Sequence, residues 1–139
     1  MTFAFTVAVL SLWATGSSPD IPVISVPKVL SFCTNAGPVE LTIDGNTATG
    51  WYLLVVTPEV KKGTIKGTFD KGLIHAVWTD PDGSGKIIFG FNPDLTQFIA
   101  IYNRGDDSSH WYNEWKGVSK NKVLELPENS RKYLHCEFK

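Results

Sequence analysis

One short stretch of the sequence groups side chains that could transfer a proton. His110, Tyr112 and Glu114 alternate along a predicted strand, so they share one face, and Asp107 precedes them. A histidine beside a carboxylate can act as a general base, with Glu114 or Asp107 orienting the imidazole ring. The same pattern suits the polar, outward face of an edge strand. The sequence carries no nucleophile elbow, no His-Glu-x-x-His, no phosphate loop and no cysteine pair at metal-ligand spacing. We therefore lean against an enzyme and leave catalysis open.

Tryptophan and tyrosine side chains offer a different chemistry, the stacking of a sugar ring or another flat ligand. Trp111 and Trp115 point to the same face of a regular strand, and the residues between them, Tyr112 among them, are polar. Aromatic rings next to amide and carboxylate groups form a usual surface for such ligands. Because tryptophan equally often fills a core, we assign Trp51 or Trp78 to the interior.

Two short motifs imitate binding sites but have ordinary alternatives. The segment 80–85 (DPDGSG) begins like a calcium-binding loop, yet Phe91 stands where that loop needs a bidentate glutamate, so we expect a hairpin turn. Arg104, Gly105 and Asp106 match the integrin-recognition tripeptide in the polar segment 103–109. A string of three residues carries little information, and we expect a solvated hairpin tip rather than an integrin-type contact.

Strands must position these side chains, because short runs of β-forming residues separated by Gly, Asp, Asn and Pro fill residues 39–118. Val39, Leu41 and Ile43 alternate with polar residues, and residues 70–72 (DKG) join two runs as a hairpin turn. Seven runs joined by hairpin-length loops predict an up-and-down antiparallel meander. The runs cover residues 39–43, 47–56, 63–69, 73–79, 86–91, 97–102 and 111–118.

Two further patterns indicate that the meander closes into a small barrel. A small residue precedes an aromatic one in run after run, as in 67–69 (GTF), which indicates bent strands or rings packed over bare backbone. Later runs such as 86–91 are apolar on both faces, which a one-sided sheet would not tolerate. We therefore predict an all-β barrel, formed by closure of the antiparallel meander, with at most one short C-terminal helix. Residues 127–136 suit that helix and a final strand equally well.

Composition and charge agree with a single small domain over residues 17–139. Of the 139 residues 42% are hydrophobic and 19% are charged, which excludes a disordered polar segment and a coiled coil. The formal net charge of -1 does not supply the basic surface that a nucleic-acid backbone requires. We expect no nucleic-acid partner.

The two ends of the sequence bear on the compartment. Residues 1–16 are apolar and uncharged, which suits a secretory signal peptide or a native strand, and they are shorter than the roughly 20 residues of a membrane span. The two cysteines, Cys33 and Cys136, either form a disulfide that joins both ends of the domain or stay as buried thiols. We favour the signal peptide and the disulfide, and therefore a secreted protein.

Three stretches of the sequence resemble the opening strands of the avidin and streptavidin family, namely 34–38 (TNAGP), 41–43 (LTI) and 49–52 (TGWY). The resemblance implies an eight-stranded, avidin-like or lipocalin-like barrel in which Asn35 and Tyr52 hydrogen-bond the ureido group of biotin and Trp78 forms part of the pocket wall. Pro38 stands where the family has a hydrogen-bonding serine, and Leu54 where it has another polar group. A buried ureido oxygen that lacks donors binds weakly, so these departures argue against tight biotin binding.

These observations predict a secreted, non-enzymatic binding module that takes a small-molecule or carbohydrate ligand at the barrel mouth, with no cofactor and no metal. The expected ligand-binding residues are Asn35, Tyr52, Trp78, Trp111, Tyr112 and Trp115. The alternative is a structural protein that assembles into a homo-oligomer or a fibre, in which the outward apolar residues are buried between subunits.

Overall fold

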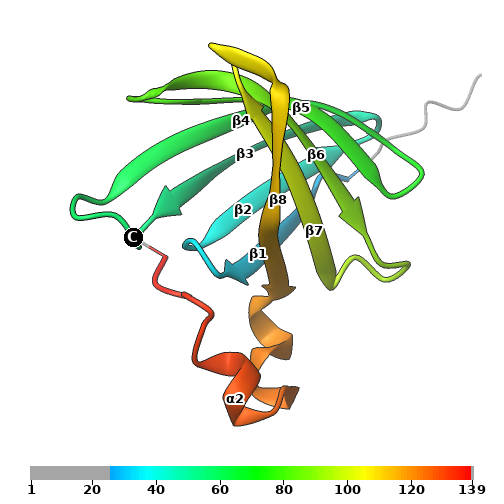
Figure 1. Ribbon diagram of the computed structural model, residues 1–139. Coiled ribbons are helices and arrows are strands. Elements are labelled where there is room, and N and C mark those ends of the chain that lie inside the picture. Colours follow the sequence, from blue (N-terminus) through cyan, green and yellow to red (C-terminus); the bar gives the residue numbers. More distant parts are fainter. Residues whose placement is uncertain (1–25, 139) are drawn as a thin grey trace, which may run out of the picture.

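Eight antiparallel strands close into one barrel in the computed structural model, which describes residues 26–138 (Figure 1). Each strand pairs with the next along the chain and β8 returns to β1, so the predicted all-β meander and its closure are confirmed. The segment 1–16, for which we predicted a signal peptide, lies outside the described residues. The strands are β1 (Lys28–Thr34), β2 (Val39–Asp44), β3 (Thr47–Leu54), β4 (Lys61–Asp70), β5 (Leu73–Asp80), β6 (Gly83–Phe91), β7 (Gln97–Arg104) and β8 (Asp107–Ser119).

Strand β5 shows how the alternating sequence produces the barrel wall. Ile74, Ala76 and Trp78 are buried and point inward, whereas the residues between them are exposed. The hairpin predicted before this strand is confirmed. Lys71 (φ 51°) and Gly72 (φ 78°) take the left-handed conformations that a two-residue hairpin turn requires.

Two turns at one end of the barrel are tighter than the sequence indicates. Residues 81–82 alone join β5 to β6, and residues 105–106 alone join β7 to β8. The hairpins predicted in the segments 80–85 and 103–109 are thus confirmed, but the strands extend into both segments and leave shorter turns. The glycines and serines in these segments have low strand propensity and therefore suggested loops. Pairing with the neighbouring strand overrides that propensity and draws them into β6 and β8. Gly85 permits this pairing, because an added Cβ would lie 2.0 Å from a backbone oxygen of β7.

Phenylalanine rings fill the middle of the barrel. The ring centroids of Phe32 and Phe98 are 5.0 Å apart, as are those of Phe89 and Phe98, and both pairs meet edge to face. Trp115 contacts Phe89 and Phe98 and forms the boundary of this core on one side. The interior is therefore solid below Trp115.

Bare glycine backbone lies under two of the interior rings, at Gly63 and Gly117 rather than at the glycine of the small-to-aromatic run 67–69, where an added Cβ would meet the backbone of β5. A Cβ at Gly63 would lie 2.0 Å from the ring of Tyr52, and one at Gly117 would lie 2.2 Å from the ring of Phe98. No side chain fits at either position without moving a ring. These glycines therefore bring the rings close to the wall of the barrel.

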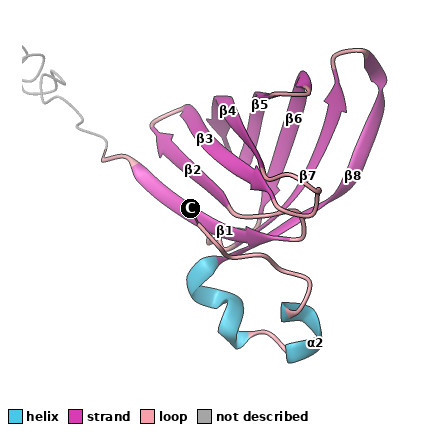
Figure 2. Cartoon of the chain, turned by 90° about the vertical axis from the view of Figure 1, so that its left-hand side faces the viewer, coloured by secondary structure: helices cyan, strands magenta, loops and turns pink. Residues whose placement is uncertain are grey.

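The barrel closes along a short seam between its first and last strands. β1 and β8 pair over only three residues each, from Phe32 to Thr34 on β1. The side chain of Asn35 extends the seam, because its Nδ2 donates to the carbonyl oxygen of Glu114 and its Oδ1 accepts the N–H of Lys116 at 3.1 Å. The first half of β8 pairs with β7 and extends beyond this seam, and the β7–β8 hairpin projects at the upper edge of the barrel (Figure 2).

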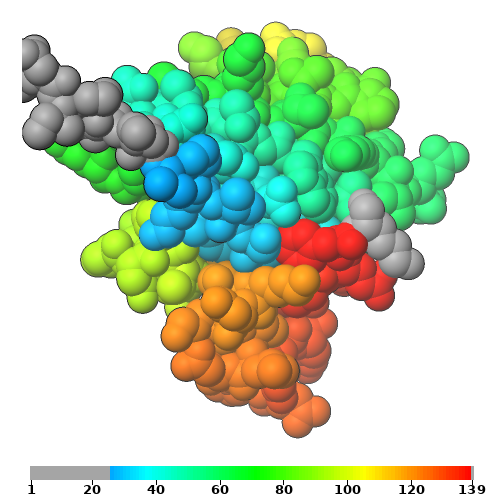
Figure 3. All heavy atoms as spheres, turned by 180° about the vertical axis from the view of Figure 1, so that it is seen from behind, coloured from blue at the N-terminus to red at the C-terminus, as the bar shows by residue number. Residues whose placement is uncertain are grey.

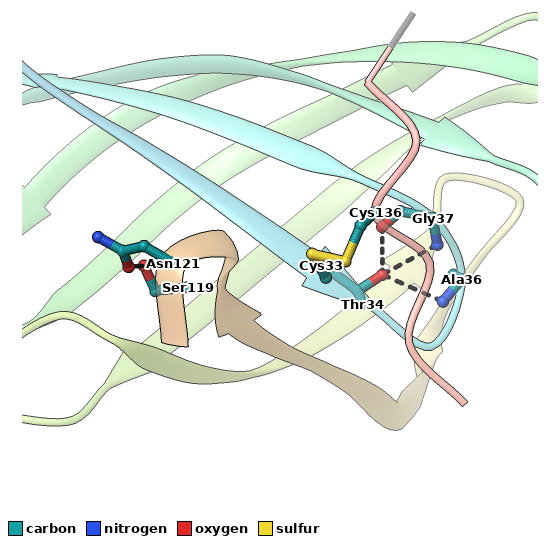
Figure 4. Close-up of a disulfide and its surroundings, with 7 residues drawn as sticks. All are labelled: Cys33, Thr34, Ala36, Gly37, Ser119, Asn121 and Cys136. Carbon is teal, nitrogen blue, oxygen red and sulfur yellow. Dashed lines mark hydrogen bonds between the residues drawn. A yellow bond between two sulfur atoms is a disulfide. The ribbon is translucent and has the colours of Figure 1, made fainter. Parts of the chain in front are cut away.

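A disulfide fastens the C-terminal segment to the seam. Cys33 and Cys136 are bonded, with their Cα atoms 4.6 Å apart, so of the two alternatives the disulfide is correct (Figure 4). The segment lies against the outside of the barrel beside β1 (Figure 3). There the ring of Phe138 lies 5.9 Å from that of Trp51, which is therefore outside the barrel, whereas Trp78 is inside.

The C-terminal segment combines a short helix with a single strand contact. A 3-10 helix η1 (Lys120–Glu125) and a four-residue helix α2 (Glu128–Arg131) precede an isolated bridge between Thr34 and His135. Both alternatives for residues 127–136 are thus partly right. Neither helix in the described part of the chain has the length and apolar character that a membrane span needs.

Candidate functional site

A cavity of about 690 Å³ lies at the barrel end where the β5–β6 and β7–β8 hairpins and the β1–β2 loop meet the end of β3. This volume is within the range of roughly 300–1,000 Å³ that is usual for small-molecule sites. The structure brings all the sequence-predicted ligand residues to this one cavity. They are Asn35, Tyr52, Trp78, Trp111, Tyr112 and Trp115.

Two buried tryptophans line the inner part of the cavity, and each uses its indole N–H within the protein. Nε1 of Trp78 donates to the carbonyl oxygen of Asn103 at 2.8 Å. Nε1 of Trp115 donates to Oγ1 of Thr34 at 2.8 Å. Both indoles are less than 10% exposed, with values of 6% and 8%. They therefore present ring surface to the cavity and no free donor.

Thr34 fixes the Trp115 ring from the seam. Its hydroxyl also accepts the backbone N–H groups of Ala36 and Gly37, both at 3.0 Å, and donates to the carbonyl oxygen of Gly37 (Figure 4). Thr34 is fully buried. One hydroxyl thus orders the β1–β2 loop and the cavity floor together, and it is next to the disulfide at Cys33.

Tyr52 and Asp80 form a hydrogen-bonded pair on the cavity wall. The phenol donates to Oδ2 of Asp80 at 2.9 Å, and Oδ1 accepts the backbone N–H of Asp82 at 2.8 Å. The pKa of Tyr52 is raised far above its usual value. Burial of the phenol is the larger cause, and the adjacent Asp80 carboxylate is the second. The phenol therefore remains protonated, and it holds the half-buried carboxylate in one orientation.

The first half of β8 supplies the rim of the cavity and departs from a regular strand. The register of β7 and β8 shifts between Ala100 and Tyr102 and again between Tyr102 and Arg104. As a result residues 110–115 all line the cavity, so the expected alternation of faces along this strand is wrong. Trp111 is 38% exposed and Trp115 is 8% exposed. Both tryptophans nevertheless reach the cavity.

Aromatic rings meet one another around this end of the barrel. Tyr102 stacks on Tyr112 with centroids 5.0 Å apart and an interplanar angle of 19°. Tyr102 also meets Trp78 and Trp115 almost at right angles, each at 6.3 Å. Tyr52 meets Trp115 at 5.4 Å and 76°. We call the three rings of Trp78, Tyr102 and Trp115, which all line the cavity, the aromatic box.

The proton-transfer group predicted around His110 has a different set of contacts. The His110 ring lies 4.5 Å from the Tyr112 ring, edge to face. Oδ1 of Asp107 accepts the hydroxyl of Ser109 at 2.9 Å. His110 and Glu114 both line the cavity, but within residues 26–138 no hydrogen bond links the imidazole to a carboxylate.

The two imitation motifs lie at hairpin tips beside the cavity. In the calcium-like segment the Asp80 carboxylate accepts the two hydrogen bonds described above, and no group of three or more metal-ligating side chains occurs in the described part of the chain. Arg104 ends β7 and its Nε lies 3.7 Å from Oδ1 of Asp106, with both side chains largely exposed.

Sequence reasoning missed Asp80, Tyr102 and Thr34 as residues that build the cavity. Tyr102 carried a signal, since it ends one of the small-to-aromatic runs. Asp80 was assigned only to a turn, although a carboxylate at the end of a strand faces the barrel mouth. Thr34 gave no signal at all, because its partners are distant in the sequence.

Comparisons of the chain with protein-family models, with curated proteins and with solved structures found no match.

Proposed function

We propose that this protein is a non-enzymatic binding module that takes a small organic ligand in the cavity at the barrel mouth. One observation carries the proposal: a cavity of about 690 Å³ has a floor of buried tryptophan and a rim of half-exposed aromatic residues. A ligand that covers solvent-exposed ring surface gains binding free energy. A pocket whose shape is already fixed before binding loses little conformational entropy when the ligand enters.

The resemblance to the avidin family supports the same location. The resemblance implies ligand contacts by Asn35, Tyr52 and Trp78, and these residues line one cavity. The Asn35 amide already bonds to the backbone of β8, and the Tyr52 phenol already donates to Asp80. Biotin is therefore one member of a test panel and not our preferred ligand.

A fluorescence titration tests the proposal. The panel contains biotin, N-acetylglucosamine, cellobiose, choline, 2-phenylethylammonium and the neutral alcohols matched to the last two. We expect at least one member to change the tryptophan emission saturably. Tyr112→Ala removes a rim ring and lowers the affinity at least tenfold. Tyr133→Ala removes a 64% exposed ring outside the cavity and leaves the affinity unchanged. A flat response to the whole panel overturns the proposal.

We further propose that the protein works outside the reducing cytoplasm. The disulfide between Cys33 and Cys136 supports this location, because such bonds persist in oxidising compartments. Secretion through the segment 1–16 is part of the same proposal. Intact mass of the natively exported protein tests it, since removal of a signal peptide would shorten the chain by about that segment.

Self-assembly is a second candidate function, and a patch on the outer wall of the barrel favours it. Leu73, Val77 and Ile99 are 44%, 50% and 57% exposed on β5 and β7, and Leu73 and Ile99 both flank Gly90 of the strand between them. A second subunit could bury these side chains. Light scattering at increasing concentration tests this function, and a constant monomer mass excludes it.

A further inference from the structure

The hydrogen-bond donors of Tyr52 and of the two buried tryptophans, in the inner part of the cavity, are already used by the protein. The indole N–H groups of Trp78 and Trp115 bond to β7 and to Thr34, and the phenol O–H of Tyr52 bonds to Asp80. A sugar or another neutral polar ligand needs such donors for its oxygen atoms. The inner cavity therefore offers few partners to a ligand whose recognition depends on carbonyl or hydroxyl oxygens.

Besides the side-chain donors of Tyr102 and of the rim residues Trp111 and Tyr112, the cavity presents groups that carry negative charge or negative potential. The faces of aromatic rings are the negative side of their quadrupole and attract cations. The Tyr102 ring lies at nearly right angles to the rings of Trp78 and Trp115, and all three residues line the cavity. An ammonium group inside the aromatic box contacts several ring faces at once.

Two carboxylates on the cavity wall form no ion pair in the described part of the chain, although the Lys61 ammonium that pairs with Asp82 also attracts Asp80 at longer range. Among the described residues, the ion pairs join Lys61 to Asp82, Arg104 to Asp106 and a third pair near the C-terminus, so neither Asp80 nor Glu114 takes part in one. Asp82 and Arg104 also line the cavity, but each has a partner of opposite charge within 4.0 Å. The lining therefore holds a surplus of negative charge.

Asp80 is the better placed of these two carboxylates. It is half-buried, and hydrogen bonds from the Tyr52 phenol and the Asp82 N–H fix both of its oxygens without neutralising their charge. Glu114 is exposed on the rim of the cavity. A carboxylate that is held in place and partly shielded from water attracts a cation more strongly than a mobile one at the surface.

From the used donors, the aromatic box and the two unpaired carboxylates, we infer that the ligand of this cavity is a small organic cation, an amine or a quaternary ammonium compound. Asp80 faces the charge and the rings of Trp78, Tyr102 and Trp115 surround it. This inference rests on the proposed function, because it names the ligand class of the same cavity.

Matched pairs of ligands separate charge from shape. Choline has a charged nitrogen where 3,3-dimethylbutan-1-ol has a neutral carbon. 2-Phenylethylammonium has a charged ammonium group where 2-phenylethanol has a neutral hydroxyl. In titrations of the full chain followed by tryptophan fluorescence and by calorimetry, we expect each cation to bind at least tenfold more tightly than its neutral partner. We also expect the preference to fall as salt is added, since ions screen the rim charges.

A variant pair then tests the role of Asp80. Asp80→Asn keeps the shape and one acceptor oxygen for the Tyr52 phenol, loses the acceptor for the Asp82 N–H and removes the charge. We expect the affinity for both cations to fall at least tenfold and the affinity for the alcohols not to change. Asp70→Asn makes the same change of net charge at the opposite end of the barrel and has no effect. If Asp80→Asn does not fold, Glu114→Gln and the ligand pairs on the unaltered chain still decide the question.

The outcomes distinguish the cation inference from the proposed function. Saturable binding of biotin or a sugar with no cation preference overturns the cation inference and leaves the binding function standing. If no member of the panel binds, both the cation inference and the proposed binding function are overturned. A cation preference that persists unchanged in Asp80→Asn and Glu114→Gln overturns the assignment of the carboxylates.

Discussion

Replacing Thr34 with valine removes one hydroxyl on which the hydrogen bonds of the seam converge. Thr34 Oγ1 accepts N–H groups from Ala36, Gly37 and Trp115 at 2.8–3.0 Å and donates to the carbonyl oxygen of Gly37. Valine has nearly the same shape, so the substitution tests the hydroxyl rather than the packing. We expect a large loss of stability, because these donors have no alternative acceptor in place.

The size of the loss follows from which donors are buried. Gly37 and Trp115 are buried and water cannot easily replace the hydroxyl, whereas Ala36 is half-buried and its N–H can turn to water. A buried donor left without a partner costs about 1–3 kcal/mol. Two such donors lower the free energy of unfolding by about 2–6 kcal/mol, which is a large part of the roughly 5–15 kcal/mol of a typical domain.

Urea unfolding in oxidising buffer, followed by tryptophan fluorescence, measures this loss while the disulfide stays intact. Thr34→Ser is the matched control, because it keeps the hydroxyl and removes only a buried methyl group, at about 1 kcal/mol. We expect the valine variant to be at least 1 kcal/mol less stable than the serine variant. Equal stability of the two variants would refute the role that we assign to the hydroxyl.

Three further predictions follow from the disulfide, a glycine and a phenol. Reduction of the Cys33–Cys136 bond, which spans 103 residues, lowers the free energy of unfolding by up to about 4.7 kcal/mol in urea titrations with and without dithiothreitol; equal stability contradicts this. Gly63→Ala forces the Tyr52 ring to move and destabilises the fold by about 1–3 kcal/mol in thermal unfolding. Gly90→Ala is the control and leaves the stability unchanged, because its Cβ would have no neighbour closer than 3.8 Å. If Gly63→Ala is equally neutral, the close packing of the Tyr52 ring is wrong. Burial and Asp80 raise the pKa of Tyr52, so above about pH 10 the folded state keeps a phenol proton that the unfolded state loses. The free energy of unfolding therefore falls as the pH rises above about 10, and Tyr52→Phe flattens this dependence. An unchanged pH profile in Tyr52→Phe contradicts the prediction.

The alternation of apolar and polar residues was sufficient to predict most of the barrel. It located β2 and β5 almost to the residue, because each of these strands has one face in the core and the other in water. It did not reveal β1, in which Phe32, Cys33 and Thr34 are all buried. Both faces of β1 are covered there, the inner by the core and the outer by the C-terminal segment, so the period of two is absent.

The aromatic part of the cavity was also within reach of the sequence, but its polar part was not. Tryptophans and tyrosines that end strands on the same side of a meander must gather at one end of the barrel. The register shifts between β7 and β8, which bring residues 110–115 to the rim, depend on the fit of two strands and leave no mark in either one. The pairing of Tyr52 with Asp80 likewise joins residues that are 28 positions apart.

The indole N–H signals of the protein in a nitrogen-15 correlation spectrum test the cavity as a ligand site most directly. Trp78, Trp111 and Trp115 line the cavity, while Trp51 lies outside the barrel beside Phe138 and serves as an internal control. On titration with 2-phenylethylammonium, we predict saturable shifts of the three cavity signals with one common affinity and a stationary Trp51 signal. Stationary cavity signals at saturating ligand, or a shift at Trp51 as large as those of the cavity, would contradict binding at the barrel mouth.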